Sequence, residues 1–195
     1  MSIVYDYSGG LYINLTNRCP CRCSFCVRQY TDGLGSADSL LLEAEPTVEE
    51  VIEELARWDV CRYDEVVFCG YGEPTERLDA LLKIAAHIKQ TYAKPIRINT
   101  IGLADLIWKR ETAPELAGLI DTVSVSMNEA DAGKFNALCH PRFGAGSYEA
   151  MMKYIMDVKR YVPNVTTSVV GCISPESIQI CRKKAEAMGV GFRVR

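Results

Sequence analysis

The sequence from Leu11 to Cys26 reads LYINLTNRCPCRCSFC, a short apolar run that passes directly into four cysteines. The apolar run, Leu11–Leu15, is the first of several β-rich segments that alternate with longer segments of helical period. This alternation indicates repeated βα units and a parallel sheet. The strands predicted in this way are Leu11–Leu15, Glu65–Cys69, Ile96–Thr100, Thr122–Ser126, Val165–Val170 and Gly191–Val194.

Helical segments separate the predicted strands. Thr47 and Glu50 have the spacing of a capping box, and apolar residues then recur at helical spacing as far as Trp58. A later helical segment is interrupted by Pro114. The other predicted helices are Leu78–Thr91, Ser147–Tyr161 and a last helix that begins with Ser174 and Pro175 and ends at Gly189.

These βα units predict an α/β fold: a partial, open (β/α)6 barrel with parallel strands, similar in architecture to a TIM barrel. Right-handed crossovers place the helices outside the sheet. Functional residues of such barrels lie at the carboxyl ends of the strands. At 195 residues the chain is long enough for one domain with a complete core, so residues 1–195 are expected to form a single domain.

Composition favours a soluble protein of a reducing compartment. No apolar run approaches the roughly 18 residues of a membrane span, and the N-terminus MSIVYDYSGG lacks the features of a secretory signal, so the expected location is cytoplasmic. Nine cysteines there favour thiols or metal ligands over disulfides. A formal net charge of −3 gives no support for nucleic-acid binding.

The density of cysteines between Cys19 and Cys26 indicates a cluster site. Cysteine thiolates hold iron–sulfur clusters, and a short loop lets several sulfurs converge on one object. A closed four-thiolate site that includes Cys21 would suit structural zinc or an electron-transfer cluster, but no second CxxC pair follows it. The other interpretation takes Cys19, Cys23 and Cys26 as ligands in a CxxxCxxC arrangement and leaves Cys21 as a further thiol.

This CxxxCxxC segment resembles that of the radical S-adenosylmethionine (SAM) superfamily, with Phe25 as the aromatic residue before the third cysteine. The resemblance implies a [4Fe–4S] cluster on Cys19, Cys23 and Cys26, with one iron open to S-adenosyl-L-methionine. It also implies reductive cleavage of SAM to methionine and a 5′-deoxyadenosyl radical that abstracts hydrogen from a substrate. The protein would supply binding, orientation and exclusion of water.

The ends of later predicted strands extend the resemblance. Gly70-Tyr71-Gly72-Glu73-Pro74 resembles the family's GGEP motif, which contacts the methionyl ammonium, although a tight turn would also explain its glycines. Ser124, Ser126 and Asn128 alternate along one strand face and can bond ribose hydroxyls or a carboxylate. The positions that the resemblance gives to the cofactor site are Phe25, Gly70, Tyr71, Gly72, Glu73, Asn99, Ser124, Ser126, Asn128 and Val170.

Three further features have more than one interpretation. The loop from Val27 to Pro46 is long for a connection and is interpreted as a functional lid. Cys139 and His140 could act as a thiol–imidazole pair near the substrate, although adjacent residues rarely face each other. Arg193 and Arg195 on the last strand could reach a carboxylate or phosphate, or could lie at an exposed edge.

The leading functional prediction is a radical SAM enzyme of open reaction class, for which no catalytic residue is assigned. The alternative is an iron–sulfur electron carrier or redox sensor without SAM turnover, which a fourth thiolate from Cys21 would favour. Cluster reduction requires a partner such as flavodoxin or ferredoxin. The segments Leu41–Pro46 and Phe192–Arg195 are most similar to the small radical SAM proteins associated with TatD-type nucleases.

The substrate cannot be predicted from the strand ends, because specificity resides in loops. Because the chain ends just after the last predicted strand, we expect a bulky partner such as a peptide or protein segment, or a homodimer that closes the site.

Overall fold

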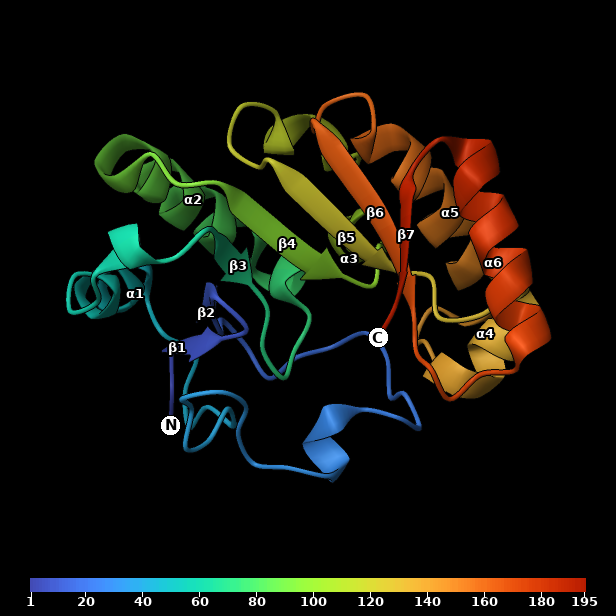
Figure 1. Cartoon of the computed structure of the whole chain (residues 1–195), viewed down its shortest axis with the longest axis horizontal. Coiled ribbons are helices and arrows are strands. Elements are labelled where there is room, and N and C mark those ends of the chain that lie inside the picture. The colour runs from blue at the N-terminus through green and yellow to red at the C-terminus, as the bar shows by residue number, and fades with distance from the viewer.

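A computed structural model describes the whole chain, residues 1–195, and contains one seven-stranded sheet in the order β1-β2-β3-β4-β5-β6-β7. β1 pairs antiparallel with β2, and every later pair is parallel. β1 and β7 remain the two edges of the sheet, so the barrel is open (Figure 1). The strands are β1 (Val4–Tyr7), β2 (Gly10–Ile13), β3 (Val66–Phe68), β4 (Ile96–Thr100), β5 (Thr122–Ser126), β6 (Asn164–Val169) and β7 (Gly191–Val194).

The helices lie along the outer side of the curved sheet, and the chain between β2 and α1 crosses its opposite side (Figure 1). This arrangement confirms the predicted open α/β fold with parallel strands. None of the helices is long and apolar enough to cross a lipid bilayer. The α-helices are α1 (Val48–Leu55), α2 (Leu78–Tyr92), α3 (Ala104–Trp108), α4 (Ala132–Cys139), α5 (Ser147–Val158) and α6 (Pro175–Met188), and the 3-10 helices are η1 (Val27–Gln29), η2 (Val60–Arg62), η3 (Pro74–Arg77), η4 (Ala113–Leu116) and η5 (Gly144–Gly146).

Local capping explains where the best-predicted helices begin and end. The Thr47 hydroxyl accepts a hydrogen bond from the Glu50 N–H at 3.1 Å, and the Glu50 carboxylate accepts one from the Thr47 N–H at 2.7 Å. These two bonds satisfy donors that the first turn of α1 leaves free. At the start of α6 the Ser174 hydroxyl accepts a hydrogen bond from the Ser177 N–H at 3.1 Å, and Gly189 ends α6 with a left-handed φ of 62°.

Two elements are absent from the sequence-based prediction. β1 has only four residues, VYDY, and joins β2 through Ser8 and Gly9, whose φ values of 50° and 82° form a tight hairpin turn. The prediction of six parallel strands therefore missed one antiparallel edge strand. The other missed element is α4, in which only Phe135 and Cys139 are buried, so its sequence has little helical periodicity.

The two faces of the sheet differ in chemistry. Val123 and Val125 of β5 face the helices and belong to the main apolar core. Side chains alternate along a strand, so Ser124 and Ser126 face the opposite, concave side. The concave side also carries Asn99 of β4. The fold thus places polar side chains on the inner surface, near the carboxyl ends of the strands.

Leu81 of α2 is fully buried in the main core, and its replacement tests that the helix packs on the sheet. We expect Leu81→Ala to lower the free energy of unfolding by about 2–5 kcal/mol, because the substitution removes buried methyl groups and leaves a cavity. Chemical denaturation monitored by circular dichroism measures this loss. The matched control is Leu41→Ala, because Leu41 is 54% exposed, and its effect should stay within about 0.5 kcal/mol.

Candidate functional site

One cavity of about 490 Å³ brings most of the predicted site residues together. It opens where the cysteine loop, residues 19–26, meets the carboxyl ends of β3 to β7. Gly70, Tyr71 and Ser124 do not line it, and Ile101 lines it without having been predicted. The predicted residues that line the cavity are Cys19, Cys23, Phe25, Cys26, Gly72, Glu73, Asn99, Ser126, Asn128 and Val170, and the others are Cys21, Val27, Cys69, Thr100, Ile101 and Arg195.

The cysteine loop is held on one flank by the C-terminal end of α4. The N–H groups of Arg22 and Ser24 donate to the carbonyl oxygens of Cys139 and Leu138, both at 3.0 Å. The Arg142 N–H donates to the Pro20 carbonyl oxygen at 2.8 Å. These main-chain bonds tie the loop to the last residues of α4 and to Arg142 beyond it.

The loop's other flank packs against the end of β3, where glycines are required. A Cβ at Gly70 would overlap the Asn14 side chain, and one at Gly72 would overlap the Thr16 carbonyl oxygen and lie 2.5 Å from the Arg18 carbonyl oxygen. The Glu73 N–H also donates to the Arg18 carbonyl oxygen at 2.8 Å. The glycines of the GGEP-like segment therefore let this segment pack closely against residues 14–18. The sequence-based interpretation gave these glycines a role in ligand binding and did not include this packing role.

Glu73 ties the ends of β3 and β4 together beneath the cavity. Its carboxylate accepts hydrogen bonds from the Thr75 N–H, the Thr75 hydroxyl, the Thr100 hydroxyl at 2.6 Å and the Ile101 N–H at 2.8 Å. Burial raises the pKa of Glu73, while the hydrogen bonds from Thr100 and Thr75 act in the opposite direction. Both carboxylate oxygens are thus already engaged by the protein.

A family model described as the Radical SAM superfamily matches residues 13–179, which include the cysteine loop and the ends of β3 to β6 around the cavity. The chain belongs to the radical SAM superfamily. A search of the curated proteins found no significant match.

Solved radical SAM structures share the fold over nearly the whole chain. A radical SAM methyltransferase from Sphaerobacter thermophilus is 16% identical with a TM-score of 0.61, covering 98% of this chain and 68% of the other. Streptococcus suis SuiB bound to S-adenosylmethionine is 15% identical with a TM-score of 0.70, covering 96% and 39%. Methylornithine synthase (PylB) is 15% identical with a TM-score of 0.66, covering 95% and 52%. This radical SAM chain thus spans about two thirds of the first protein and less of the other two.

The thiols of this radical SAM site form a connected group. Hydrogen bonds with the Cys139 and Cys21 thiols lower the pKa of Cys23 to about 4, and the same bonds raise the pKa values of Cys139 and Cys21. Burial raises the pKa of Cys19 to about 12. The proximity of Cys139 to the cysteine loop was not predicted. Its thiol is buried and the His140 side chain is exposed, so these two side chains face different environments.

The donor set suits a cluster better than a single ion. No three His, Cys, Asp or Glu side chains converge closely enough to hold one metal ion. Cys19, Cys23 and Cys26 instead lie around a cavity of about 490 Å³, and a cubane places its thiolate ligands on separate iron atoms. The residues present therefore fit the cluster that the CxxxCxxC motif implies.

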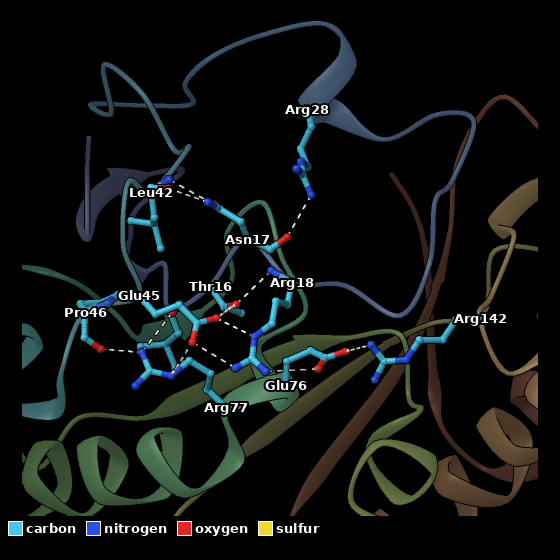
Figure 2. Close-up of polar contacts among 11 residues, drawn as sticks. Thr16, Asn17, Arg18, Arg28, Leu42, Glu45, Pro46, Glu76, Arg77 and Arg142 are labelled. Atoms are coloured by element: carbon cyan, nitrogen blue, oxygen red, sulfur yellow. Dashed lines mark hydrogen bonds and ion pairs between the residues drawn. The ribbon is translucent and has the colours of Figure 1, made fainter.

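A polar network anchors the segment that precedes α1 to the start of the cysteine loop (Figure 2). Arg18 donates to Glu45 from Nε at 2.7 Å and from Nη2 at 3.0 Å, and Asn17 exchanges two hydrogen bonds with the main chain of Leu42. Leu42 is itself buried. Of the predicted Val27–Pro46 lid, only Val27 lines the cavity, so the end of this loop is a packed part of the fold.

The Arg142 side chain provides a second anchor in the same network (Figure 2). Its Nη1 lies 3.0 Å from Oε1 of Glu76, whose side chain is only 4% exposed. Because the Arg142 main chain also binds Pro20, this residue connects η3, the cysteine loop and the segment after α4.

Gly72→Ala tests the close approach of β3 to the cysteine loop. We expect the substitution to lower the free energy of unfolding by about 1–3 kcal/mol, because the added methyl group must displace main-chain atoms. Thermal or chemical unfolding measures the change. Gly146→Ala is the matched control, since its Cβ would meet no atom within 4 Å and its φ is −75°. Equal stability of the two variants would contradict the packing described here.

Proposed function

We propose that this chain is a radical SAM enzyme that holds a [4Fe–4S] cluster on Cys19, Cys23 and Cys26. The bound cluster would supply one electron to SAM, giving methionine and a 5′-deoxyadenosyl radical that abstracts hydrogen from a substrate. The observation that carries the proposal is that the three motif cysteines line the same cavity as the strand ends that the resemblance gives to SAM. SuiB shares this fold, and its crystal structure contains bound S-adenosylmethionine.

The residues of the cavity would divide the work of binding SAM. Asn99, Ser126 and Asn128 offer hydroxyl and amide groups to the ribose or the methionyl carboxylate. Phe25 and Val170 supply apolar surface for the adenine and exclude water. All five side chains belong to the cysteine loop or to segments at strand ends, which limits their freedom to move.

The predicted residues outside the cavity would act through their neighbours. Tyr71 donates from its hydroxyl to the Thr31 carbonyl oxygen and packs with Tyr5 and Tyr12. Gly70 packs against Asn14. These positions support the loop and the strand end, and we propose no direct contact between them and SAM.

Cys21 is the competing ligand. It lines the cavity, yet its side chain is only 7% exposed and packs in the main apolar core. Cys19 and Cys23 are partly exposed at the edge of that core. We therefore propose that Cys21 does not bind iron and that the open iron remains available to SAM.

The partners and the subgroup are parts of the same proposal. A low-potential electron donor such as flavodoxin or ferredoxin would reduce the cluster, and the substrate would be a peptide or protein segment. Membership in the TatD-associated subgroup is supported by the segments Leu41–Pro46 and Phe192–Arg195. These segments lie near the site: Glu45 binds Arg18 and Arg195 lines the cavity.

SAM cleavage is the direct test of the enzyme. Protein reconstituted with iron and sulfide under anaerobic conditions, then reduced with dithionite in the presence of SAM, should release 5′-deoxyadenosine and methionine in equal amounts. Liquid chromatography with mass spectrometry measures both products. Reduction and reoxidation of the cluster without either product would instead support the electron carrier or redox sensor.

Two cysteine variants test the ligand assignment. We expect Cys23→Ala to lose nearly all cluster iron after reconstitution, because one of three protein ligands is removed, and Cys21→Ala to keep wild-type iron and sulfide content. Iron and sulfide analysis with absorption spectroscopy provides the measurement. Equal loss of iron in both variants would show that Cys21 is also a ligand and would remove the open iron from the proposal.

A further inference from the structure

The concave face of β5 to β7 is lined by polar side chains. Val165 and Val169 of β6 face the helices and belong to the main core, so Thr166 and Ser168 face inward. TIM barrels normally fill their interior with branched apolar side chains. Towards the carboxyl ends of these three strands, the inward-facing residues that carry polar side chains, with the residue that follows β7, are Ser124, Ser126, Thr166, Ser168, Arg193 and Arg195.

Two arginines on this face are paired only with neutral groups. Arg195 donates from Nη2 to the Ser126 hydroxyl at 3.1 Å and to the Asn128 side-chain oxygen at 3.3 Å. Arg193 donates from Nη2 to the Ser124 hydroxyl at 3.2 Å. Neither arginine forms an ion pair with a carboxylate of the chain.

Arg97 on β4, by contrast, is paired with a carboxylate. Arg97 binds Glu65 through Nε and through Nη2, the latter at 2.6 Å from Oε1. Its positive charge is thus matched within the sheet. Arg193 and Arg195 have the same planar donor groups, which suit carboxylate and phosphate oxygens, but no carboxylate of the chain lies within ion-pair distance of them.

Arg195 lines the cavity without an ion pair to any carboxylate of the chain. Glu73 and Arg195 are the only charged residues that line it. The Glu73 carboxylate already accepts four hydrogen bonds from Thr75, Thr100 and Ile101.

An unpaired hydroxyl lies beside the arginines. The register places Ser168 between Ser126 of β5 and Arg193 of β7. Ser168 is 1% exposed, and its hydroxyl oxygen has no hydrogen-bond partner. A buried hydroxyl without a partner carries a free-energy cost, which a bound acceptor at this position would remove.

We propose that Arg193, Arg195 and Ser168 form a binding site for an anionic group, a carboxylate or phosphate, of the substrate. The placement of that substrate beside the radical rests on the proposed function, but the anion site itself does not. Arg195 lies at the carboxyl end of β7 and Arg193 one inward-facing position before it, so a substrate held there would extend into the barrel from the cysteine end.

The methionyl carboxylate of SAM is the other possible source of the anion, and the experiment separates the two. Inorganic phosphate is titrated by calorimetry into the anaerobically reconstituted, oxidised protein, with and without saturating SAM. The oxidised protein does not turn SAM over, so the result is independent of SAM cleavage. Failure of SAM cleavage with intact phosphate binding would count against the proposed function alone.

We expect phosphate to bind with a dissociation constant in the millimolar range, in the presence of SAM as well as in its absence. Arg193→Gln and Arg195→Gln should each weaken binding about tenfold or more, because each removes a charge-assisted hydrogen bond. Arg195→Lys keeps the charge and should weaken binding less. Arg160→Gln is the matched control on an exposed surface and should leave the dissociation constant unchanged.

Three results would overturn the proposal. They are the absence of phosphate binding to the wild-type protein, equal affinity in all the variants, and loss of phosphate binding when SAM is present. The third would transfer the anion site to the SAM carboxylate. Circular dichroism and thermal unfolding of each variant confirm that a loss of binding does not come from a loss of fold.

Discussion

The main-chain contact between the cysteine loop and the end of β3 is the constraint on which the rest of the site depends. Gly72 leaves no room for a side chain because the carbonyl oxygens of Thr16 and Arg18 occupy that space. The contact brings the cysteines, which follow β2, against the carboxyl end of the neighbouring strand. Main-chain hydrogen bonds from the loop to the end of α4, and from Arg142 to the loop, fix its other flank, so the thiols are positioned by backbone geometry.

Much of the fold follows from local sequence signals. A capping box formed by Thr47 and Glu50 starts α1, and Gly189 ends α6. Both signals act between residues only a few positions apart in the sequence. β1 escaped prediction because its pairing depends on two left-handed residues, Ser8 and Gly9. α4 escaped because it buries few side chains. Neither element has the regular hydrophobic pattern from which the other strands and helices were predicted.

The part of the candidate site that lies at strand ends could be predicted from the sequence. Parallel strands bring their carboxyl ends to one edge, so the residues that end β4 and β5 were expected near the cysteines. Cys139 was expected near the substrate only through a pairing with His140, because nothing in the sequence shows that α4 packs beside the cysteine loop. Tyr71 turns away from the cavity. Side-chain direction after a strand depends on the turn that follows, which spacing alone does not determine.

The arginines at the end of the chain also affect whether the open edge of the sheet can pair with another molecule. An unclosed barrel leaves two strand edges whose main-chain groups could pair with another chain, and natural proteins discourage such pairing with charged side chains that point inward from an edge strand. Arg193 lies on an edge strand of this kind. A second molecule that added a strand beside β7 would have to enclose this charge. The same guanidinium groups therefore disfavour strand pairing at this edge.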